Sequence, residues 1–172
     1  MRWSKLKQRI ENNFAESVKS RVALHSTTYG ESTCGHAWLT LDGAVIANFC
    51  TRAHFNRFDY GDKGRDEGLT EQQKKRYKEQ CVEYGEMSRQ AVYRTCWSYI
   101  HELSFEDAIK SEDPLIQSLA MLDKRLGKRR LKRMKDQDLH PLARKLFEVR
   151  TSAETTPCPK PFSSPVRPMA SA

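Results

Sequence analysis

Cysteine and histidine occur together twice in the first third of the chain, and their side chains suit both metal binding and nucleophilic catalysis. The pairs are Cys34 with His36 and Cys50 with His54. Thiolate and imidazole are usual ligands of zinc, and a thiol beside an imidazole base is a usual nucleophile. Neither pair shows the two-residue spacing between cysteines that is typical of structural zinc sites. We therefore predict no metal and no cofactor, and cysteine catalysis stays an open alternative.

The expected hairpin argues against convergence of these four residues. Asp42 and Gly43 lie between two strand-like runs, which is a strong signal for a two-residue turn. In this register His36 and Cys50 point to opposite faces of the sheet, so we expect no shared site. The same register pairs Leu41 with Ala44, Leu39 with Ile46 and Ala37 with Asn48.

A basic stretch at residues 122–135 is the strongest functional signal. Eight of its fourteen side chains are Lys or Arg, and residues 123–150 hold eleven cations against four acids, so this part carries most of the formal net charge of +8. A local excess of positive charge attracts polyanions such as DNA or RNA, although a solvated helix face is the common alternative. The predicted nucleic-acid-binding residues are Lys124, Arg125, Lys128, Arg129, Arg130, Lys132, Arg133 and Lys135, with auxiliary roles for Arg144, Lys145 and Arg150.

A second segment, residues 52–60, mixes cations with aromatic side chains. Aromatic rings can stack on bases while Arg and His hold phosphates, as in proteins that bind single strands. Helical spacing of aromatics is more often a packing pattern, however, so we expect Phe55 and Phe58 to anchor this connection against the core.

Two other functions compete with nucleic-acid binding. One is a small hydrolase or nuclease that uses a face formed by His36, Trp38 and His54, and the other is an interaction module whose basic helix docks an acidic protein partner of unknown identity. The chain lacks paired carboxylates, an ordered Ser-His-Asp set and a glycine-rich phosphate loop. The sequence therefore assigns no catalytic residue and leaves the question of an enzyme open.

The periodicity of apolar residues predicts an α+β fold, a three-stranded antiparallel meander packed with an N-terminal helix and a C-terminal group of helices. A capping box at Thr70 and Gln73 begins a long predicted helix that runs to Leu103, with Gly85 as its weak point. The other predicted elements are a helix at 3–18, strands at 21–29, 36–41 and 44–51, helices at 104–110, 114–126 and 141–150, and the basic helix at 124–135.

Composition predicts one domain, residues 1–150, followed by a disordered tail rich in Pro and Ser at residues 151–172. The odd number of cysteines, five, argues against a disulfide framework. The N-terminus has no apolar run of the length found in signal peptides, and no stretch is apolar over the ~20 residues that a membrane span needs. We therefore expect a cytoplasmic protein without membrane association.

Several short blocks carry a resemblance to a known family. They are the opening Trp3-Ser-Lys-Leu-Lys, the Leu-His-Ser-Thr at 24–27, the Asn-Phe-Cys-Thr at 48–51 and the Leu-Asp-Lys-Arg-Leu-Gly-Lys-Arg-Arg-Leu at 122–131. Together they resemble a family of short, uncharacterised bacterial proteins over most of residues 1–150. The resemblance implies a bacterial cytosolic protein and no particular activity.

Overall fold

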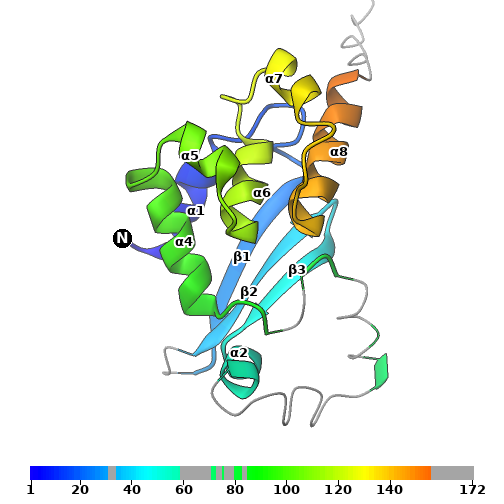
Figure 1. Cartoon of the computed structure of the whole chain (residues 1–172). Coiled ribbons are helices and arrows are strands. Elements are labelled where there is room, and N and C mark those ends of the chain that lie inside the picture. Colours follow the sequence, from blue (N-terminus) through cyan, green and yellow to red (C-terminus); the bar gives the residue numbers. More distant parts are fainter. Residues whose placement is uncertain (31–33, 59–70, 73–74, 76–79, 83–84, 156–172) are drawn as a thin grey trace, which may run out of the picture.

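The structure is a computed structural model of the chain, and it describes residues 1–30, 34–58, 71–72, 75, 80–82 and 85–155. These residues form an α+β domain in which helices pack over an antiparallel sheet (Figure 1). Among them, no helix is long and apolar enough to cross a membrane.

The sheet is the predicted three-stranded meander. Its strands β1 (Val22–Thr28), β2 (Gly35–Leu41) and β3 (Ala44–Cys50) are antiparallel and lie in chain order. Asp42 and Gly43 form the predicted turn, with φ angles of 49° and 82°. Positive φ at both central residues matches the right-handed twist of the two strands, which explains why the Asp-Gly pair is found here.

The register beyond the turn differs from the predicted one. Leu41 lies opposite Ala44 as expected, but Leu39 pairs with Ala47 rather than Ile46, because the register shifts by one residue between Leu39 and Thr40. An extra residue in one strand is a β-bulge. Relative to the predicted register, it moves each later side chain of that strand to the opposite face of the sheet. The bulge also sets His36 directly opposite Cys50.

One face of the sheet forms the core with the helices. Leu24, Leu39, Ala47 and Phe49 are each at most 1% exposed on this face. Helix α1 (Trp3–Glu11) contributes its buried residues Leu6 and Ile10, and it ends well before the predicted residue 18. Glu11 Oε1 then accepts a hydrogen bond of 2.9 Å from the amide of Leu24, so α1 lies along the edge of β1.

The predicted long helix is not continuous: residues 71–72, 75 and 89–101 are helical, but a non-helical stretch separates them. Helix α4 spans only Arg89–His101, and Ser88 caps it by accepting a hydrogen bond from the amide of Ala91. Residues 80–82 and 85–88 are not helical, and the predicted capping box at Thr70 and Gln73 lies outside the described residues. Gly85 has a φ of 81°, which a regular helix does not allow.

The C-terminal helices confirm most of the predicted group. They are α5 (Phe105–Lys110), α6 (Pro114–Leu122), α7 (Lys128–Arg133) and α8 (Pro141–Thr155). Asp113 caps α6 as its position before a proline suggests, but α6 ends at Leu122 rather than at residue 126. Helix α8 continues five residues past the predicted boundary at 150, and residues 156–172 of the predicted tail lie outside the described residues.

Candidate functional site

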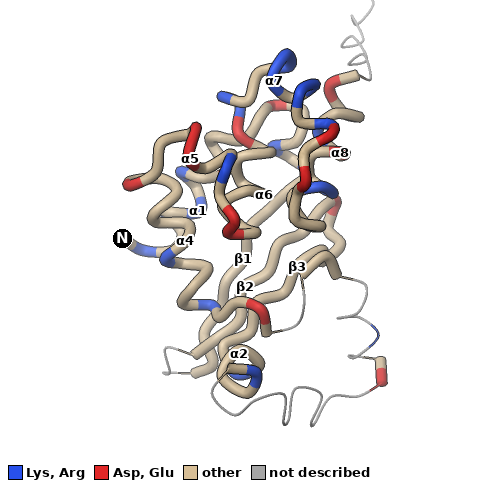
Figure 2. The backbone as a smooth tube through the Cα atoms, viewed as in Figure 1, with Lys and Arg blue, Asp and Glu red and all other residues tan. Residues whose placement is uncertain are grey.

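Helix α7 carries the cations of the predicted basic segment at one end of the molecule, while α2 (Thr51–Phe58) lies at the other end of the sheet (Figures 1 and 2). All eight predicted binding residues are exposed. Within the described ranges, the side chains of five of them take part in no hydrogen bond, ion pair or cation–π contact. We call these five the α7 surface: Lys128, Arg129, Lys132, Arg133 and Lys135.

The apolar residues of this segment explain why its cations face solvent. Leu131 and Met134 are each 3% exposed and pack into the core, which fixes the opposite side of α7 toward water. Gly127 is the N-cap residue of α7. Arg144 of α8 donates hydrogen bonds to the main-chain carbonyls of Lys135 and Gln137, and so holds the turn that follows α7.

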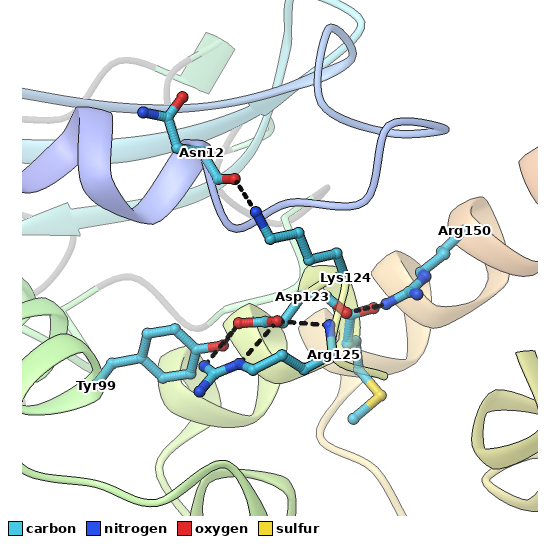
Figure 3. A network of polar contacts seen from close by, with 7 residues as sticks. Asn12, Tyr99, Asp123, Lys124, Arg125 and Arg150 are labelled. Carbon is cyan, nitrogen blue, oxygen red and sulfur yellow. Dashed lines mark hydrogen bonds and ion pairs between the residues drawn. The ribbon is translucent and has the colours of Figure 1, made fainter. Parts of the chain in front are cut away.

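The other three predicted residues already have partners. Lys124 Nζ donates to the carbonyl oxygen of Asn12 at 3.1 Å, and Arg130 pairs with Glu106. Arg125 forms an ion pair with Asp123 at 2.8 Å (Figure 3). These cations hold the domain together, so the candidate interface is smaller than the sequence suggests.

Asp123 is the centre of the network in Figure 3. It is buried, and its carboxylate accepts hydrogen bonds from the hydroxyl of Tyr99 at 2.7 Å and from Arg125 Nε at 3.0 Å. Burial alone would raise the pKa of Asp123, but the hydrogen bonds from Arg125 and Tyr99 outweigh it and hold this pKa below its ordinary value. Burial, with the charge of Asp123, raises the pKa of Tyr99.

Arg150 has no part in the surface, which corrects the expected auxiliary role. It is 2% exposed and donates to the carbonyl oxygens of Met121 at 2.9 Å, Asp123 at 2.6 Å and Leu126. The guanidinium also pairs with Glu154 one turn along α8. Arg150 therefore fixes the loop between α6 and α7 from inside the protein.

A hollow adjoins the α7 surface where α7 meets α8. Its cavity volume is about 360 Å³, and its walls combine two ammonium groups and two hydroxyl side chains with a carboxylate and an aromatic ring. Cations beside donors of this kind can hold a phosphate or a sugar. The lining residues are Lys132, Lys135, Phe147, Glu148, Thr151 and Ser152.

The predicted face of His36, Trp38 and His54 is only partly assembled. The rings of His36 and Trp38 stack with centroids 4.8 Å apart, and His25 stacks on Trp38 at 5.0 Å. His54 lies on α2, where its Nδ1 is 3.1 Å from the carbonyl oxygen of Gly85. The alternation of β1 could have placed His25 on this face, since it pairs with Trp38.

The aromatic residues of α2 contradict the expected packing role. Phe55 is 47% exposed and Phe58 is 59% exposed, so neither anchors α2 against the core. His54 packs against Phe58 instead, and Arg57 lies over the same ring.

Cys34, Cys50, Cys81 and Cys96 form no disulfide with one another. Burial raises the pKa of the Cys81 thiol, and it raises the pKa of Cys96 further. In the part of the chain that the structure describes, no group of three or more His, Cys, Asp or Glu side chains is arranged to hold a metal ion.

Comparison with known proteins gives a family and nothing finer. No curated protein and no solved structure matches the chain. The family model that matches covers residues 2–151, from the start of α1 into α8. The chain therefore belongs to the SF0329 protein family.

Proposed function

We propose that the protein binds a polyanion, DNA or RNA, through the α7 surface. The observation that carries this proposal is the set of five exposed cations that, among the described residues, have no acidic partner. A helix face that serves only solubility gains from interspersed charges of both signs, whereas α7 has six residues of which five are Lys or Arg. The cysteines without disulfides agree with a cytoplasmic location, which is part of the proposal.

The spacing of the cations suits a phosphate backbone. Lys128 and Lys132, like Arg129 and Arg133, are four residues apart and so lie on the same side of the helix. Each phosphate that such a cation neutralises releases counterions, which makes the affinity depend on salt. Contacts of this kind position a nucleic acid without reading its bases, so the proposal includes no sequence specificity.

The test is charge reversal at the α7 surface with a matched control. Arg129→Glu/Lys132→Glu removes two cations that have no described partner, so the fold should survive. The control Lys5→Glu/Arg94→Glu changes the net charge equally at exposed residues of α1 and α4. Binding of fluorescently labelled single-stranded and duplex DNA and RNA is measured by anisotropy in low salt.

We expect the α7 variant to bind at least about tenfold more weakly than the wild type, and the control to retain most of its affinity, because non-specific binding depends on local phosphate contacts. Equal losses in both variants would show that only net charge matters. The proposal would also fail if the wild type bound none of these nucleic acids at low salt. Binding of an acidic protein with no binding of nucleic acid would favour the docking alternative.

A further inference from the structure

A second cavity lies between α1, α4 and the loop that leads into α7, apart from the hollow between α7 and α8. Its volume is about 320 Å³, at the lower end of the range of about 300–1,000 Å³ that is usual for small-molecule sites. Three parts of the chain form its walls. Arg9 and Asn12 come from the end of α1, Tyr99 and Leu103 from the end of α4, and Arg125 from the loop. A cavity of this size suits a small molecule.

The side chain of Arg125 is held in one orientation at this cavity. Its Nε and Nη2 atoms donate to the two carboxylate oxygens of Asp123 at 3.0 and 2.8 Å (Figure 3). The guanidinium carbon also lies over the ring of Phe105, 4.7 Å from its centroid. Within the described part of the chain Nη1 donates no hydrogen bond, so its N–H groups remain for a ligand. A group that is already ordered loses less entropy when a ligand binds.

Arg9 brings a positive charge that no acid among the described residues balances. Its Nη1 atom donates to Nε2 of His101 at 2.9 Å. Nδ1 of His101 lies 3.0 Å from the carbonyl oxygen of Trp97. A carbonyl oxygen only accepts, so the proton is on Nδ1 and the neutral ring accepts at Nε2. The described partner of Arg9 is thus uncharged, and Nε and Nη2 keep their N–H groups for a ligand.

The cavity combines positive charge with an apolar wall. Among the described residues that line it, two are arginines and none is acidic. The buried carboxylate of Asp123 balances the charge of Arg125. Lys124 adds a further cation at this junction, since its Nζ donates to a main-chain carbonyl at the end of α1 at 3.1 Å (Figure 3). Ile100 and Leu103 supply carbon surface. An anion with a small organic body therefore matches the walls.

We propose that this cavity binds a small organic phosphate, with Arg9 and Arg125 as the residues that hold the phosphate group. A guanidinium presents N–H groups in a planar fork that matches phosphate oxygens. A phosphate monoester has three terminal oxygens, so it can accept from α1 and from the loop at once, whereas a carboxylate has two. The organic part of the ligand packs on Ile100 and Leu103. The site shares no residue with the α7 surface and is independent of polyanion binding there.

The test is a titration of the ¹⁵N-labelled full chain with phenyl phosphate, followed by two-dimensional NMR. We expect saturable shifts at the amides of the cavity residues below about 10 mM ligand, which allows for the modest free energy that a ligand of this size gains. Phenol lacks the anionic group and benzoate replaces it with a carboxylate. Both should bind at least about tenfold more weakly than phenyl phosphate, because charge-assisted hydrogen bonds are lost.

Two variants with equal charge change separate the cavity from the rest of the surface. Arg9→Gln removes one guanidinium of the site and should weaken phenyl phosphate binding about tenfold or more. Arg94→Gln removes the same charge from an exposed residue of α4 that does not line the cavity, and should keep the wild-type affinity. Arg129→Glu/Lys132→Glu, which alters the α7 surface, should keep it too.

Four results would overturn the proposal. They are a wild type without saturable shifts, shifts confined to α7, benzoate binding as tight as that of phenyl phosphate, and equal affinities in Arg9→Gln and Arg94→Gln. The first two are read from the wild type alone and do not depend on how a variant folds.

Discussion

The guanidinium of Arg150 lies 2.6 Å from the main-chain carbonyl oxygen of Asp123, although 27 residues separate the two in the chain. This hydrogen bond joins α8 to the loop that leads from α6 into α7. The candidate interface therefore depends on an arginine that is itself buried and unable to touch a ligand.

Replacing Arg150 should destabilise the domain. Arg150→Met leaves three buried carbonyl oxygens without their donor, and each unsatisfied group costs about 1–3 kcal/mol. We expect the free energy of unfolding, measured by urea denaturation, to fall by about 3 kcal/mol or more. Arg94→Met is the control, because Arg94 is exposed on α4 and should change this free energy by less than about 0.5 kcal/mol. A stable Arg150→Met variant would mean that α8 does not fix this loop.

Asp123 should make the free energy of unfolding depend on pH in the acid range. Its pKa is lowered in the folded protein, so its contribution is fully present above the ordinary carboxyl value of 3.8 and is lost as the pH falls through the lower, folded-state value. We expect the wild type to lose more stability than Asp123→Asn between neutral pH and this acid range. Urea midpoints measured across the range test this, and parallel curves for the two proteins would contradict it.

Two glycines differ in what an added methyl group would meet. At Gly85 the φ is +81° and a Cβ would lie 2.8 Å from the carbonyl oxygen of Ala53, whereas at Gly127 nothing lies within 4 Å. We expect Gly85→Ala to cost about 1–3 kcal/mol of folding free energy and Gly127→Ala to cost less than about 1 kcal/mol. Thermal or urea denaturation of the two variants compares them directly. Equal costs would show that the turn before α4 can relax.

The sequence predicted the meander and the C-terminal helices because their signals are local. The Asp42-Gly43 turn and the Asp113-Pro114 helix start each need only the residues around them. The bulge in β3 was not predictable, because no residue of the Ala44–Cys50 run marks the extra position, and a register shift of one residue moved Cys50 to the face of His36.

The candidate site was predicted only in outline, because the sequence shows local signals but not contacts between distant residues. The density of Lys and Arg located the basic segment, but exposure and pairing depend on residues distant in the chain. Lys124 contacts Asn12, and Arg130 pairs with Glu106. No pattern in the sequence links either cation to its partner. Arg150 likewise looked like one more surface cation until its buried partners were known.

The salt dependence of binding tests the central claim most directly. If the five cations of the α7 surface contact phosphates, the logarithm of the association constant for single-stranded DNA or RNA should fall against the logarithm of salt concentration with a slope of about −3.5, and with about −4.5 for duplex DNA. Arg129→Glu/Lys132→Glu should reduce the steepness of both slopes by about 1–2. A slope near zero, or one that this variant leaves unchanged, would contradict polyanion binding through α7.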